Sequence, residues 1–182
     1  MIKLQNVRLG AFPALFNKPV FNGEPQDKYN CKLLLDPEEH ADEIAAIKDE
    51  IKSLSQERWK GAKLPSDKYC LRSGEDTGKD YNDGYFVLSA STKQRPVVVD
   101  RRKAQITEED GVIYAGCRVN AAVSLWVMDN SYGKRICAEL EGVQFVADDD
   151  PIEAGGGRSA AQRLEAFDSL DDEDDDDMFA VA

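Results

Sequence analysis

The chain has 182 residues, enough for one globular domain with an appendage, and 42% of them are hydrophobic, enough for a packed core. Its net charge of −12 would by itself argue against a nucleic-acid partner. However, residues 148–182 hold 13 acids and two bases, whereas residues 1–147 are nearly neutral. The overall charge therefore describes the C-terminal segment and excludes little about the body.

The first ten residues lack the basic and apolar regions of a signal peptide, and the longest apolar stretch, 121–128, is far shorter than a membrane span. The four cysteines are widely spaced without a CxxC pair, and the chain has one histidine, so we expect no metal site. These features predict a cytoplasmic protein with reduced, mostly buried cysteines and no contact with membranes.

The first elements alternate and then change period. Residues 2–9 predict a strand, 18–25 a loop or hairpin, and 28–36 a half-buried strand, in which Cys31 and Lys32 point to opposite faces. Asp36 and Pro37 then form a helix start, and apolar residues spaced three or four apart continue to about Gly61. We expect His40, in the first turn of this helix, to be a solvated surface residue.

The rest of the body has the pattern of β-structure. Strands are predicted at 68–72, 85–93, 96–100, 111–129 and 134–147, with Gly116 at a bulge or close approach and a hairpin turn at 130–133. The predicted fold is mainly β: an OB-fold-like five-stranded barrel with one prominent helix after an early strand; a β-sandwich with one helix is the alternative. The predicted domains are a body (1–147), a Gly-rich flexible linker (148–164) and a disordered acidic tail (165–182).

The common enzyme motifs are missing from the sequence. It contains no GxxxxGK[ST] phosphate loop, no GxGxxG after a strand, no HExxH and no GxSxG. Most of its paired carboxylates lie in the acidic tail, where no pocket would shift their pKa. We therefore expect a protein without catalytic residues or cofactors; an accessory nuclease that uses scattered acids and Mg²⁺ remains an alternative.

Two features indicate a binding surface instead. On the long strand after Cys117, one face is apolar, and the other carries Arg118, Asn120 and Trp126, which suits a stacking platform for bases. The alternative is that Trp126 packs under the helix and Arg118 is an ordinary surface residue. A dense group of cations, from Lys93 to Lys103 and close to tyrosines, is the second feature; its alternative is a solvated edge strand. The predicted DNA-binding residues are Trp126, Arg118, Lys93, Arg95, Arg101, Arg102, Lys103, Tyr85, Tyr81 and Lys32.

The block IYAGCRVNAAVSLWVMDNSYGKRICAELEGVQFVADDDPIEAGGG (113–157), with QRPVVVD (94–100) and KYNCKLLLD (28–36), resembles a family of phage-encoded single-stranded-DNA-binding proteins. The resemblance implies an OB-fold, binding of single-stranded DNA with little sequence preference, a role in phage DNA replication, recombination or repair, and the cytoplasm of an infected host. The matching positions, such as Gly116, Cys117 and Gly142, are mostly structural, so the resemblance does not select the residues that contact DNA.

The acidic tail is the last feature. Replicative single-strand binders of bacteria and podophages typically end in an acidic segment closed by an aromatic residue, which this chain resembles, although three residues follow Phe179. The tail is long enough to reach any face of the body, so it could compete with DNA and, once displaced, dock phage or host replication proteins. The predicted partner-binding residues are Asp171, Asp172, Glu173, Asp174, Asp175, Asp176, Asp177 and Phe179.

Three alternatives stay open at this point. An acidic interaction module or DNA mimic could use the tail to sequester a basic partner, and the tail could equally serve solubility alone. The protein could be a monomer, or a homodimer paired through an exposed edge strand.

Overall fold

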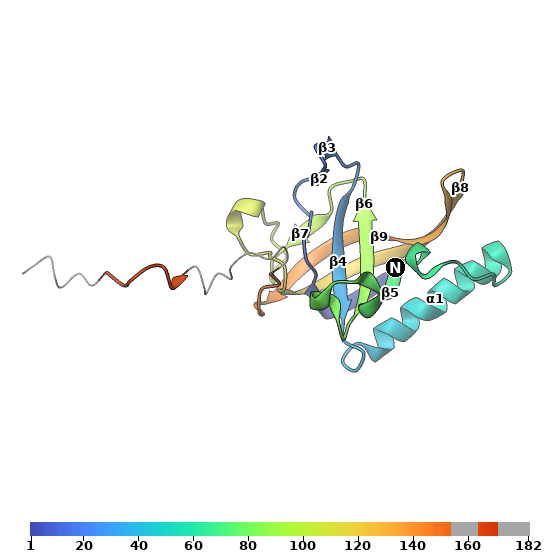
Figure 1. Ribbon diagram of the computed structural model, residues 1–182, viewed down its shortest axis with the longest axis horizontal. Coiled ribbons are helices and arrows are strands. Elements are labelled where there is room, and N and C mark those ends of the chain that lie inside the picture. Colours follow the sequence, from blue (N-terminus) through green and yellow to red (C-terminus); the bar gives the residue numbers. More distant parts are fainter. Residues whose placement is uncertain (154–163, 171–182) are drawn as a thin grey trace, which may run out of the picture.

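The computed structural model describes residues 1–153 and 164–170 (Figure 1). The predicted acidic run, Phe179 and most of the predicted linker lie outside the described residues. The strands are β1 (Ile2–Leu9), β2 (Val20–Phe21), β3 (Glu24–Pro25), β4 (Tyr29–Leu35), β5 (Leu71–Ser73), β6 (Phe86–Thr92), β7 (Val97–Val99), β8 (Arg118–Asn130) and β9 (Gly133–Ala147). The helices are α1 (Ala41–Trp59) and the short 3₁₀ turns η1 (Ser66–Lys68), η2 (Glu75–Thr77), η3 (Asp80–Asn82) and η4 (Glu108–Asp110).

Five strands close into a ring, as predicted for an OB-type barrel. β1 pairs with β4, β4 with β6, β9 with β8 and β8 with β1, all antiparallel, and a parallel pairing of β6 with β9 completes the circle. Within the described residues the sheet has seven strands, because the short strands β5 and β7 extend the free edges of β6 and β9. The mainly β prediction is confirmed, and the strands predicted at 68–72 and 96–100 correspond to β5 and β7, which lie beside the ring.

The strands bury alternate residues as their sequence pattern predicts. In β4, Cys31 and Leu33 are buried while Lys32 is exposed, and Leu34, assigned to the outer face by its period, is buried as well. In β9 the buried positions shift from Leu140 to Val143, because the pairing with β8 slips by one residue there. This bulge keeps apolar side chains inside a strongly twisted strand.

The helix begins later than its sequence signal indicates. The Asp36 carboxylate accepts hydrogen bonds from the backbone N–H groups of Glu38 and Glu39, but these residues form turns, and α1 begins at Ala41. The turns fold His40 inward, so the expectation of a solvated histidine is wrong: the ring is 2% exposed. Its Nδ1 accepts from the Asp36 N–H, and its Nε2 lies 3.1 Å from the Gln5 carbonyl oxygen on β1.

The helix ends as predicted. Lys60 and Gly61 follow Trp59 with φ of 54° and 83°, the left-handed conformation that terminates helices. The buried stripe of α1 includes Ile44 and Ile47, which join the barrel core. Among the described residues, no helix is both long and apolar enough to cross a membrane.

Gly116 lies at a close approach of two backbones, as predicted. Its φ is +106°, and a side chain there would overlap the carbonyl of Asp150. The Ile152 N–H also donates to the Ala115 carbonyl. Residues 148–152, called the strap below, therefore lie against the start of β8, which begins at Arg118 and not at residue 111 as the sequence indicated.

Candidate nucleic-acid interface

One outer face of the barrel is polar and open. The register pairs Asn30 on β4 with Ser91 on β6, Ser91 with Glu139 on β9, and Glu139 with Ser124 on β8. One step along the strands, Lys32 is paired with Ser89, and both side chains are exposed. Polar side chains across four strands, with Glu139 as the acid among them, leave a surface that a polymer chain could follow; this surface is called the outer face below.

Trp126 lies on β8 two residues beyond Ser124, opposite Cys137 on β9. Its ring is partly buried, and the Nζ of Lys28 lies 5.7 Å from the ring centroid, within cation–π range. Burial raises the pKa of the Cys137 thiol, and the charges of Lys28 and Arg135 act in the opposite direction. The structure therefore places one cation, Lys28, over this tryptophan, and the charge of Arg135 acts on the cysteine opposite it.

The exposed aromatic residues of the barrel region were missed by the sequence reasoning. Among the described residues before the gap at 154, Phe12, Phe21 and Tyr132 are 69%, 68% and 92% exposed. Phe12 and Phe21 belong to the connection between β1 and β4, and Tyr132 to the turn between β8 and β9, which Figure 1 shows projecting from the barrel. A sequence signal existed: Phe21 precedes an Asn-Gly turn and Tyr132 lies in a hairpin turn, where no core is available.

These two connections correspond to loops with a known use. In an OB-fold, the outer face of the second and third strands and the loops between strands 1–2 and 4–5 bind oligonucleotides. In the ring, the second and third strands are β4 and β6, and the two loops are those that carry Phe12, Phe21 and Tyr132. The exposed rings therefore flank the face that this architecture uses.

The predicted cationic segment is divided by the structure. Lys93 lies just beyond β6, with its ammonium 3.5 Å from the exposed Asp27 carboxylate. Arg95 donates to the Phe16 carbonyl and Arg101 to the Val146 carbonyl. Arg102 and Lys103 are exposed in the turn after β7, which the Asp100 carboxylate holds through backbone N–H groups. Only the first part of the segment is therefore beside the ends of β4 and β6.

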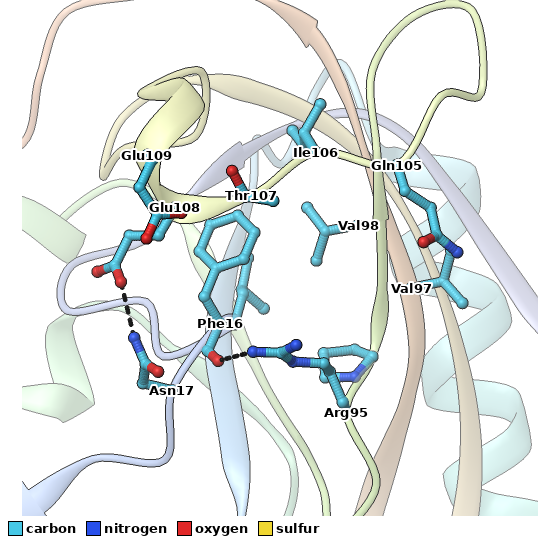
Figure 2. Close-up of a pocket in the computed structure, with 12 residues that line it drawn as sticks. Phe16, Asn17, Arg95, Val97, Val98, Gln105, Ile106, Thr107, Glu108 and Glu109 are labelled. Atoms are coloured by element: carbon cyan, nitrogen blue, oxygen red, sulfur yellow. Dashed lines mark hydrogen bonds between the residues drawn. The ribbon is translucent and has the colours of Figure 1, made fainter.

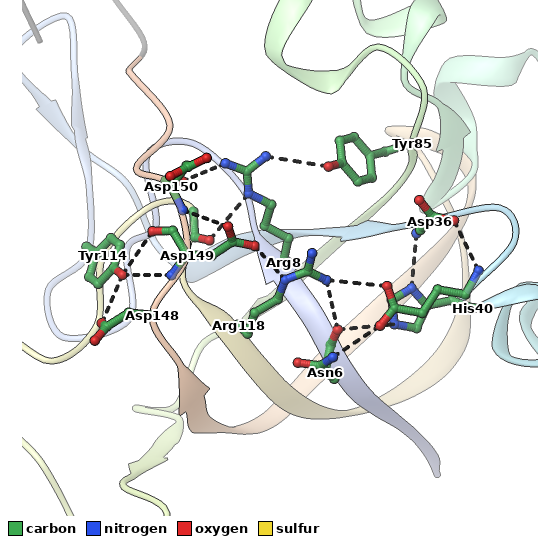
Figure 3. A network of polar contacts seen from close by, with 12 residues as sticks. Asn6, Arg8, Asp36, His40, Tyr85, Tyr114, Arg118, Asp148, Asp149 and Asp150 are labelled. Carbon is green, nitrogen blue, oxygen red and sulfur yellow. Dashed lines mark hydrogen bonds and ion pairs between the residues drawn. The ribbon is translucent and has the colours of Figure 1, made fainter.

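Arg118 and Tyr85 lie elsewhere, at the strap (Figure 3). Arg118 Nε donates to Asp149 Oδ2 at 2.7 Å, and its Nη1 is 3.6 Å from Glu39 Oε2. The neighbouring Arg8 donates to the Asp150 carbonyl and to the Tyr85 hydroxyl. The hydrogen bond from Arg118 holds the pKa of the Asp149 carboxyl below its usual value. The cations here are already paired with groups of the same chain.

Tyr81 is also separate from the outer face. It belongs to η3 and lines a hollow with Gly78, Lys79 and Glu153, a residue that follows the strap. The ten predicted DNA-binding residues thus fall into three places. On or beside the outer face are Lys32, Trp126 and Lys93; around β7 are Arg95, Arg101, Arg102 and Lys103; towards the strap are Arg118, Tyr81 and Tyr85. Their contacts with DNA remain predictions.

The closed ring, the open polar face and the aromatic residues on its two flanking loops define an OB-type oligonucleotide-binding fold. The comparisons agree with this class. The family described as the ssDNA-binding protein of Enterobacter phage Enc34 matches residues 1–179, and the chain belongs to this family.

The chain is similar to three further proteins. It is 38% identical over 188 residues to the putative protein p50 of Acyrthosiphon pisum secondary endosymbiont phage 1, covering 98% of both chains. It is 27% identical, with a TM-score of 0.73, to the single-stranded DNA-binding protein of bacteriophage Enc34 solved in complex with ssDNA, covering 83% of this chain and 88% of that one. The single-stranded DNA-binding protein gp2.5 of bacteriophage T7 shares 16% identity at a TM-score of 0.51, over 86% and 96% of the two chains, a likeness of fold alone.

Proposed function

We propose that this protein binds single-stranded DNA with little sequence preference during phage DNA replication, recombination or repair. The observation that carries the proposal is the outer face, where Trp126 lies under the Lys28 ammonium between two loops with exposed aromatic rings. Family membership and the Enc34 protein solved with ssDNA support it.

The chemistry of this face suits a single strand more than a duplex. Unstacked bases can stack on aromatic rings, and each stacked base is worth about 1–3 kcal/mol by alanine substitution. Lys28 and Lys32 supply charge along the same path for the phosphates. Ser91 and Ser124 in the middle of the outer face are small, so on this face stacking and charge rather than readout of base edges govern binding.

The acidic tail completes the proposal. Residues 171–177 and Phe179 compete with DNA for the cationic side chains in the free protein and dock replication or recombination proteins once DNA displaces them. The support is the separation of charge along the sequence and the anchoring of residues 148–152, which fixes where the tail leaves the body.

The test is the affinity for a fluorescent dT oligomer at two salt concentrations. It compares the full chain with a chain that ends at Leu170, which keeps the strap, and with a full-length control whose acids at 171–177 are changed to Asn or Gln. We expect both altered chains to bind tighter than the full chain, and salt to weaken the binding of all three. If none binds, the function is wrong and an acidic interaction module becomes the better explanation.

Docking of partners needs a separate readout. Full-length protein should retain replication proteins from infected cells on a column, whereas the chain ending at Leu170 and the neutralised control should not. Equal recovery by the three forms would refute the docking role while leaving DNA binding intact.

A further inference from the structure

A cavity of about 420 Å³ lies outside the surface described above, between the connection that follows β1 and the segment around β7 (Figure 2). Its volume is within the range of small-ligand pockets, about 300–1,000 Å³. It is lined by residues of these two segments, principally Leu15, Phe16, Asn17, Arg95, Val98, Ile106, Glu108 and Glu109. Neither the strap nor the stacking residues contribute to it.

The walls of this cavity differ in chemistry. Leu15 and Val98 are buried core residues and, with the partly buried Ile106, supply an apolar floor. Arg95 lies at one side and donates one hydrogen bond, 2.8 Å long, to the Phe16 carbonyl; its other guanidinium donors have no partner among the described residues.

Two carboxylates form the opposite wall. Glu108 Oε2 accepts from Asn17 Nδ2 at 2.7 Å, which leaves Oε1 available. Glu109 is exposed and makes no hydrogen bond or ion pair within the described part of the chain. Figure 2 shows both glutamates on the side of the cavity opposite Arg95. Carboxylates beside a DNA-binding surface repel the phosphates of DNA. These two carboxylates therefore need a favourable contact with the bound strand that offsets this repulsion.

We propose that this cavity, called the base pocket below, holds one nucleobase of the bound strand and favours a base with an exocyclic amino group, such as cytosine, over thymine. The proposal rests on the single-stranded DNA binding proposed above. The apolar floor covers the faces of the base, a carboxylate accepts from the amino group, and the guanidinium meets the adjacent phosphate. Thymine presents a carbonyl oxygen where cytosine has its amino group, so it gains no such bond.

The base pocket is continuous with the outer face. Arg95 follows two residues after Lys93, which lies just beyond the end of β6. On the other side, Asn17 precedes Lys18, whose ammonium lies 5.6 Å from the ring centroid of Tyr29 at the start of β4. Ala14 and Asn30 are joined by two backbone hydrogen bonds, which fix this wall against β4. A strand that follows β4 and β6 therefore reaches the base pocket at their ends.

The experiment compares affinities for dC and dT oligomers of equal length, using the chain that ends at Leu170 and the variant E108A/E109A in the same background. The measured quantity is the ratio of the dissociation constant for dT to that for dC, determined for each protein. Intrinsic differences between the two oligomers affect both proteins alike, so they cancel when the two ratios are compared. We expect the variant to lower this ratio about fivefold, the weak end of the discrimination that a side chain gives to a base.

One control separates this effect from a general effect of charge. Glu24→Ala removes an exposed acid of the β2–β3 hairpin and should strengthen binding to both oligomers without changing the ratio. Arg95→Ala should weaken both equally, and Glu109→Ala alone should lower the ratio in part. An unchanged ratio in E108A/E109A, with normal binding to dT, would overturn the base pocket and leave the proposed function standing. Loss of binding by the unsubstituted chain would refute the proposed function itself.

Discussion

Trp126 and Arg118 both belong to β8, yet the cations at these two places contact different groups. Lys28 lies over an aromatic ring, and Lys32 is exposed. Arg118 is bonded to Asp149 and lies beside Glu39, and the neighbouring Arg8 is bonded to the strap backbone. Trp126 and Arg118 are eight residues apart along β8, which corresponds to about 25 Å. A cation on an open strand face therefore indicates a phosphate site only where the chain does not already neutralise it.

The largest expected effect of a single substitution is at Trp126. Changing Trp126 to Ala should raise the dissociation constant for a dT oligomer about tenfold or more, because a stacking surface is lost. Fluorescence anisotropy with labelled DNA measures it. Trp59→Phe is the control: Trp59 is the last residue of α1, and its indole N–H donates to Asp129 of β8, so affinity should stay unchanged. Equal affinities of Trp126→Ala and the unsubstituted protein would show that Trp126 does not stack on a base.

The exposed rings of the two flanking loops should matter next. Phe21→Ala and Tyr132→Ala should each weaken DNA binding about fivefold without lowering thermal stability, since both side chains are largely exposed. Leu164→Ala, a change at an exposed apolar residue far along the chain from both loops, is the control and should affect neither quantity. A loss of affinity in the control equal to that at Phe21 would mean that exposed apolar area, rather than the loops, governs binding.

Lys32 and Arg118 should differ in their contribution to the salt dependence of DNA binding. Lys32→Ala should reduce the log–log salt slope of binding by about 0.7, the value for one phosphate contact on a single strand. Arg118→Ala should leave the slope nearly unchanged, because Asp149 and Glu39 already balance its charge. A reduction of the slope in Arg118→Ala as large as that in Lys32→Ala would show that DNA displaces the carboxylates and that the arginine contacts phosphate after all.

Features that depend on neighbouring residues could be predicted from the sequence, whereas contacts between residues far apart in the sequence could not. The ring of strands, the end of α1 and the close approach at Gly116 depend on periodicity or on one backbone conformation, so they could be predicted. The partners of Arg118 and the burial of His40 could not, because Asp149 and Gln5 are distant in sequence and their proximity depends on how the barrel closes. The base pocket was missed for the same reason, since its two walls come from residues 15–17 and 95–109.

The smallest expected effect is at the strap, where Asp149 pairs with Arg118. Changing Asp149 to Asn removes the charge that pairs with Arg118, and this partly exposed pair should contribute at most about 1 kcal/mol to stability at pH 7. We expect the melting temperature to fall by about 2–4 °C. Asp83→Asn, at an exposed acid whose carboxylate has no hydrogen bond or ion pair among the described residues, is the control and should leave it unchanged.

The pH dependence identifies the cause of that effect. The pKa of Asp149 is lowered in the folded protein by its hydrogen bond from Arg118, so its contribution is complete above the unfolded value of about 3.9. The contribution is lost as the pH falls through the lower folded pKa, where the carboxylate takes up a proton. The melting temperatures of the protein and of Asp149→Asn should therefore differ at pH 7 and converge at strongly acid pH. A difference that persists at low pH would mean that packing of the strap, rather than its ion pair, stabilises this end of the barrel.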